Sequence, residues 1–105
     1  MVHSRVFEKI WMRIMSLGPV GQLITEKLRD AFEPSVLEVV DDSHKHKGHI
    51  GARPEGETHF SVHIVSPAFT GLTRIERHRA VNAVLADELA GPVHALAIAA
   101  EAPAN

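Results

Sequence analysis

Residues 59–65, His59-Phe60-Ser61-Val62-His63-Ile64-Val65, decide the fold of this chain. Apolar and polar residues alternate along them, so Phe60, Val62 and Ile64 share one face, as in a strand with one side buried. The whole chain has 105 residues, near the common size for one hydrophobic core. We therefore expect one domain with a small sheet.

Two further elements are predicted on the N-terminal side. Residues 36–40 are short and rich in β-branched side chains, which is typical of a strand. Pairing this strand with residues 59–65 makes a hairpin with a long histidine-rich loop at its tip. Before it, Ile24, Leu28 and Phe32 recur at four-residue spacing and predict a helix over residues 20–32.

On the C-terminal side, Thr73 and Glu76 have the spacing of a capping box and predict a helix that continues to Ala90. Its expected buried stripe comprises Ile75, Val81, Val84, Leu85 and Leu89. Residues 93–99 then form a third strand, apolar at nearly every position, as in a strand that is central or covered on both faces. The order helix, strand, strand, helix, strand predicts an α+β fold.

Three parts are distinguished along the chain: an N-terminal extension at 1–18, a domain at 19–100 and a flexible tail at 101–105. The extension has apolar residues at helical spacing, namely Val6, Ile10, Ile14 and Leu17. Neither a membrane-spanning apolar run nor a signal peptide is expected, and the chain has no cysteine, so we expect a cytoplasmic protein. The net charge of -2 favours a protein or small-molecule partner over nucleic acid.

Eight histidines are the unusual feature of the composition. The predicted loop contains His44, His46 and His49, and His94 opens the third strand. Without thiolates, a metal would be bound by imidazole, which suits zinc, copper, nickel and iron alike. The loop and His94 each also have an alternative role without metal. The loop is then simply polar and solvated, and His94 is partly buried on the same face of the strand as Leu96 and hydrogen-bonded to the backbone.

Other reactive chemistry is sparse. His59 and His63 lie on the polar face of the second strand and are expected to be solvent-facing or hydrogen-bonded side chains. Asp41 and Asp42 are adjacent in an extended segment, so their carboxylates should point apart and be solvated. No nucleophile elbow, phosphate-binding glycine loop or cysteine nucleophile is present, so an enzyme is not indicated.

Several segments together resemble the BolA family, in the order typical of that family. They are Leu37 to His44, Glu57 to Phe60, Ile64 to Ser66, Phe69 to Gly71, Arg77 to Val81, Leu85 to Leu89 and Val93 to Ile98. The resemblance implies a class II KH-like α+β fold. It has a small three-stranded mixed sheet, helices packed on one face, and room for a short extra helix at the N- or C-terminus.

The resemblance also implies a partner and a cofactor. In this family a monothiol glutaredoxin and the BolA-like protein share a bridging [2Fe-2S] cluster, ligated by the glutaredoxin cysteine and glutathione on one side. His94 matches the family's C-terminal histidine ligand on the other side. Counting from Asp42-Ser43, His46 takes the place of the loop ligand, with His44 and His49 as alternatives. The expected role is iron–sulfur cluster handling or iron and redox sensing.

Two other functions stay open. The family is also linked to transcriptional regulation of morphology and stress response, in which DNA phosphates would be contacted by Arg74, Arg77, His78 and Arg79. The acidic net charge and the lack of a GXXG loop oppose it. A histidine loop that only buffers divalent metal is the third possibility. We expect the free protein to be a monomer or a weak dimer.

Overall fold

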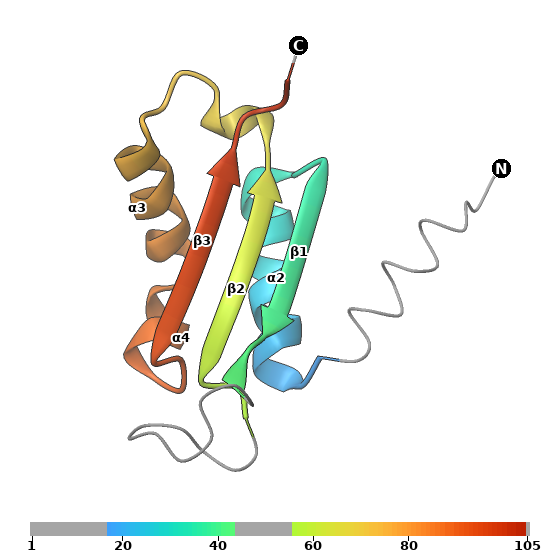
Figure 1. Ribbon diagram of the computed structural model, residues 1–105, viewed down its shortest axis with the longest axis vertical. Coiled ribbons are helices and arrows are strands. Elements are labelled where there is room, and N and C mark those ends of the chain that lie inside the picture. The colour runs from blue at the N-terminus through green and yellow to red at the C-terminus, as the bar shows by residue number, and fades with distance from the viewer. Residues whose placement is uncertain (1–16, 44–55, 105) are drawn as a thin grey trace, which may run out of the picture.

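The computed structural model describes residues 17–43 and 56–104 (Figure 1). Its elements follow the predicted order of helix, strand, strand, helix and strand. In chain order they are α2 (Pro19–Phe32), β1 (Val36–Asp41), β2 (His59–Val65), a short 3-10 helix (Pro67–Phe69), α3 (Arg74–Val84), α4 (Ala86–Ala90) and β3 (Ala95–Glu101). None of the described helices is long and apolar enough to cross a membrane.

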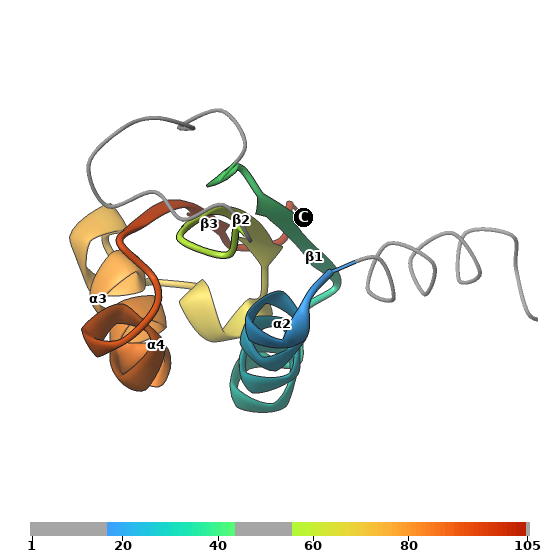
Figure 2. The same cartoon turned by 90° about the horizontal axis from the view of Figure 1, so that it is seen from below.

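The sheet is mixed, as predicted. β2 lies in the centre, pairing antiparallel with β1 and parallel with β3. The register opposes Val39 to Val62 on one side and Val62 to Ile98 on the other. All the α-helices lie against one face of the sheet, and the other face is left uncovered by the described elements (Figure 2).

The core forms on the helical face, where the alternation of β2 predicts it. Phe60, Val62 and Ile64 are at most 3% exposed. They pack with buried residues of the helices and of the segments that flank them, namely Ile24, Leu28, Phe69, Val81, Leu85 and Val93. The hydrophobic effect stabilises this two-layer arrangement, because each layer buries its apolar side against the other.

The prediction that the third strand is central or covered on both faces is wrong. β3 is an edge strand whose exposure alternates: Ala95, Ala97 and Ala99 are exposed, whereas Leu96 and Ile98 are partly buried. Alanine counts as apolar in a sequence pattern, yet its single methyl group tolerates solvent easily. The alternation was therefore hidden by alanine. β3 also extends to Glu101, the first residue of the predicted tail.

The predicted helix up to Ala90 is divided at Leu85 into α3 and α4. The capping box of Thr73 and Glu76 is present as predicted. Ile75, however, is 63% exposed and does not belong to the buried stripe. Residues four positions apart share one side of a helix, and the residue four positions before the buried Val81 is Arg77, not Ile75. Ile75 therefore projects from another side of the helix.

Candidate functional site

The two ends of the histidine-rich loop are joined by one buried hydroxyl. Ser43 is only 3% exposed. Its Oγ accepts hydrogen bonds from the backbone N–H of Thr58 at 2.8 Å and of His59 at 3.1 Å. The hydroxyl of Thr58, which is fully buried, lies 3.3 Å from the same oxygen. Ser43 thus holds the end of β1 against the start of β2.

A carboxylate reinforces the same junction. Asp41 Oδ1 accepts from the Ser43 N–H at 2.9 Å, and Oδ2 accepts from the Glu57 N–H at 3.1 Å. Asp42 points elsewhere and accepts a hydrogen bond from the Ser61 hydroxyl. The two carboxylates point apart, as predicted, but Asp41 is half-buried and structural rather than merely solvated.

Glu57 ties this junction to α2. Glu57 has a positive φ of 64°, and Gly56 before it has a φ of 81°. In this conformation Glu57 Oε2 accepts from the Gly21 N–H at 3.0 Å and so caps a helix that has no cap of its own. A Cβ at Gly18 would lie 2.6 Å from the same carboxyl group, so a larger residue there would displace the Glu57 side chain.

His94 lies directly beside the junction. Its N–H donates to the Thr58 carbonyl oxygen at 2.7 Å, and the N–H of Ala95 reaches the same oxygen at 3.2 Å. Before it, the N–H of Val93 donates to the Glu88 carbonyl oxygen at 2.9 Å. The backbone of His94 is therefore fixed, whereas its side chain is exposed rather than partly buried.

A second imidazole, that of His59, lies beside His94, and the sequence did not indicate that the two would be neighbours. The rings of His59 and His94 are nearly parallel, with centroids 6.3 Å apart and 13° between their planes. His59 Nδ1 is 2.8 Å from the Thr58 hydroxyl. The register that opposes His59 to Ala95 brings the two rings together, and only the parallel pairing of β2 with β3 could have revealed it.

The loop histidines His44, His46 and His49 lie outside the described residues. Within residues 17–43 and 56–104, no three histidine, aspartate or glutamate side chains are grouped so that they could hold a metal ion. The described part of the chain thus provides His94 and the loop stems, which meet at Thr58.

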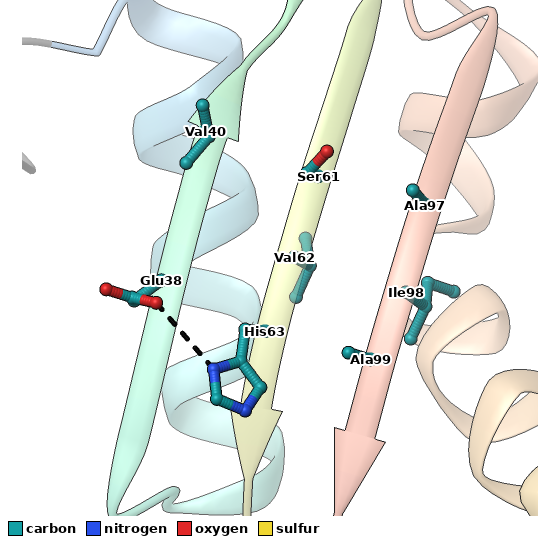
Figure 3. Close-up of a pocket in the computed structure, with 8 residues that line it drawn as sticks. All are labelled: Glu38, Val40, Ser61, Val62, His63, Ala97, Ile98 and Ala99. Carbon is teal, nitrogen blue, oxygen red and sulfur yellow. Dashed lines mark ion pairs between the residues drawn. The ribbon is translucent and has the colours of Figure 1, made fainter.

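His63 occupies a different place, on the uncovered face of the sheet. Its Nδ1 is 3.7 Å from a carboxylate oxygen of Glu38 on β1 (Figure 3). Its Nε2 is 3.1 Å from Glu101 Oε1 on β3. The hydrogen bond with Glu101 is the main reason that the pKa of His63 is raised, and Glu38 acts in the same direction. Its imidazolium can therefore link all three strands.

The basic residues of α3 divide into two kinds. Arg77 is half-buried, and its guanidinium donates to the carbonyl oxygens of Leu72 at 3.0 Å and Ala100 at 3.2 Å. His78 is also half-buried, whereas Arg74 and Arg79 are exposed. Arg77 therefore attaches α3 to β3, and the two exposed arginines remain as surface charge.

These features define a class of protein: a single small α+β domain with a one-sided mixed sheet and a fixed, solvent-facing histidine beside a hairpin junction. Comparison with known proteins agrees with this class, since residues 28–105 match the family model described as BolA-like protein. The chain belongs to the BolA-like family.

Individual relatives support this assignment. The chain is 49% identical over 90 residues to BolA-like protein 1 of Homo sapiens, and this covers 86% of the chain but 63% of that relative's length. It is 47% identical over 79 residues to the DNA-binding transcriptional regulator BolA of Escherichia coli, covering 75% of the chain and 71% of the regulator. The solved BolA domain of SufE1 from Arabidopsis thaliana has a TM-score of 0.76 at 45% identity, covering 84% of this chain and 96% of that one.

Proposed function

We propose that this chain is a partner of a monothiol glutaredoxin and co-ligates a bridging [2Fe-2S] cluster with it, for iron–sulfur cluster handling or iron and redox sensing. The cluster would supply electron-transfer or cluster-donor chemistry. The chain's own residues would bind and orient it, and this role requires no catalytic group.

The observation that carries this proposal is the placement of His94. Its backbone is fixed by the Thr58 carbonyl at 2.7 Å, whereas its imidazole is exposed beside the loop stems. A ligand shared with a second protein must be accessible to that protein and come from a fixed backbone position, and His94 meets both requirements. The chain has no cysteine, so the thiolates would come from the partner and glutathione.

The second ligand is assigned to the loop. Ser43, the last described residue before the loop, is buried at the junction. His46 follows three positions later and is our first choice, with His44 and His49 as alternatives. Histidine ligands raise the potential of a [2Fe-2S] centre relative to thiolates, and ligation by imidazole requires its neutral form.

The test is to co-purify the chain with a monothiol glutaredoxin, glutathione and the assembled cluster. We expect an absorption and circular dichroism spectrum different from that of the glutaredoxin homodimer, and His94→Ala should remove the difference. His63→Ala is the matched control, because it deletes an imidazole far from the loop stems. The ligand assignment is wrong if His94→Ala and His63→Ala give the same spectrum as the wild-type complex.

A second candidate function is favoured by one relative, which is named as a DNA-binding transcriptional regulator. In this chain Arg74 and Arg79 of α3 are exposed and could contact phosphates. A double Arg74→Gln, Arg79→Gln variant tests this without disturbing Arg77, whose loss would weaken the fold. Each lost phosphate contact should lower the slope of log affinity against log salt by about 0.9. Sequence-selective binding that survives physiological salt and is lost in the double variant would favour this function.

A further inference from the structure

Two imidazoles lie side by side at the loop stems. His59 opens β2 and His94 immediately precedes β3, and these two parallel strands start at the same end of the sheet (Figure 1). The two rings are nearly parallel, with 13° between their planes and centroids 6.3 Å apart. A group that binds to one of the two imidazoles is therefore close to the other.

The hydroxyl of Ser43 decides where the protons of this junction lie. A hydroxyl oxygen has two lone pairs and one proton. Both lone pairs of Ser43 Oγ are occupied by the backbone N–H groups of Thr58 and His59, at 2.8 and 3.1 Å. The proton shared between Ser43 and the Thr58 hydroxyl, 3.3 Å away, therefore comes from Ser43. The Thr58 oxygen accepts it, which leaves the Thr58 proton for another acceptor.

That acceptor is the ring of His59. Its Nδ1 lies 2.8 Å from the Thr58 hydroxyl oxygen, and Thr58 is fully buried, so solvent does not compete for the proton. An Nδ1 that accepts a hydrogen bond has no proton of its own, so the neutral ring has its proton on Nε2. Because the two nitrogens of an imidazole point in different directions, this Nε2–H is directed away from the buried hydroxyls.

The position of this proton gives His59 a different role from that of His94. A metal ligand needs an unprotonated nitrogen, and the only one in His59 is already bound to the Thr58 hydroxyl. His59 is therefore a hydrogen-bond donor. The carbonyl of the same Thr58 holds the backbone of His94 at 2.7 Å. One buried residue thus places both imidazoles.

We propose that the Nε2–H of His59 donates a hydrogen bond to a sulfur atom of the [2Fe-2S] cluster that His94 co-ligates, an inference that rests on the function proposed above. Reduction adds one negative charge to the cluster, and its sulfur atoms share that charge. A donor therefore stabilises the reduced form more than the oxidised form and raises the reduction potential. His59 sets the potential, whereas His94 binds the iron.

The arrangement of protons is tested in the free protein by nuclear magnetic resonance. With the ring neutral, His59 Nδ1 should have the chemical shift of an unprotonated nitrogen. The Thr58 hydroxyl proton should exchange slowly enough to be observed and should correlate with this nitrogen. Thr58→Val removes the hydroxyl but keeps the carbonyl that holds His94, so the proton signal should vanish. A proton on Nδ1 of the wild-type ring would overturn the proposal.

The contact with the cluster is tested by redox titration of the complex with a monothiol glutaredoxin and glutathione. His59→Phe keeps a ring but loses the N–H, so the ratio of reduced to oxidised cluster at the wild-type midpoint potential should fall about tenfold. His59→Gln, whose amide also donates, should recover part of this loss. His63→Phe is the matched control, because it makes the same change further along the same face of β2 and should leave the potential unchanged.

The visible spectrum separates this proposal from the proposed function. His59→Phe should keep the spectrum of the shared cluster, because His94 is still present, and far-ultraviolet circular dichroism verifies that each variant is folded. An unchanged potential in His59→Phe, or an equal shift in His63→Phe, overturns the hydrogen bond alone. Loss of the cluster in His59→Phe also overturns it, since His59 would then be a ligand. If the wild-type chain forms no shared cluster, the function and the hydrogen bond are both overturned.

Discussion

Replacing Ser43 by alanine should destabilise the domain far more than an ordinary loss of one hydroxyl. The Ser43 oxygen accepts from the N–H groups of Thr58 and His59, at 2.8 and 3.1 Å, and Thr58 is fully buried. A buried donor without a partner costs about 1–3 kcal/mol. Leaving the Thr58 N–H without its acceptor should cost close to the upper end of this range, and leaving the half-buried His59 N–H without its acceptor should cost less. We therefore expect a loss of about 3 kcal/mol, which is a large part of the 5–15 kcal/mol typical of a domain.

Urea unfolding measures this loss. The midpoint should fall while the slope with denaturant stays constant, because the surface exposed on unfolding is nearly unchanged. Ser35→Ala is the matched control: Ser35 is exposed, and its hydroxyl reaches the Val65 carbonyl only at 3.4 Å, so we expect a change within about 0.5 kcal/mol. Equal losses in the two variants would refute the argument that Ser43 joins the loop stems.

Three further predictions concern stability. Because the pKa of His63 is raised, its ion pairs stabilise the fold below about pH 6.5, and this stabilisation is lost as pH rises through the raised pKa. His63→Gln should abolish this pH-dependent stabilisation, as measured by unfolding at pH 5.5 and 8.5. The free energy of unfolding should change by less than about 1 kcal/mol, because the side chain is exposed. Lys27→Met should cost about 3 kcal/mol in urea unfolding, because the Lys27 ammonium lies 2.7 Å from the buried Glu88 carboxylate, and adding Glu88→Gln should recover much of it. Thr73→Ala removes the capping box and should lower the thermal midpoint by an amount equivalent to about 1 kcal/mol.

The central part of the fold could be predicted because large side chains mark it. The alternation of Phe60, Val62 and Ile64 fixes which face of β2 is buried, since a shift of one residue would expose all three. The helix before the sheet was equally clear, because Ile24 and Leu28 are buried as their spacing requires. These patterns depend on local sequence alone, so they predict the same buried faces that the folded structure shows.

The position of β3 could not be predicted in this way. Whether a strand is central or at an edge depends on its partners, and those lie 36 residues away in β2, as in the pair His59 and Ala95. Its alanines offered no contrast between covered and uncovered faces. The same long-range pairing brings His59 beside His94, so the second imidazole was invisible as well. His94 was a candidate metal ligand from its place in the sequence, the family resemblance pointed to it as a cluster ligand, and that role stays a prediction.

The arrangement around Thr58 explains how such a site can tolerate a variable loop. Asp41 and Ser43 close the hairpin at its stems, so the hydrogen bonds that hold the end of β1 to the start of β2 are made by residues outside the loop. His94 is held by the Thr58 carbonyl, a backbone group that any residue at position 58 would supply. In the proposed site, one ligand is therefore fixed by main-chain pairing, while the other belongs to a segment that can change without moving the first. If the proposed cluster is bound, the three histidines of the loop offer alternative second ligands while the fold and the position of His94 stay the same.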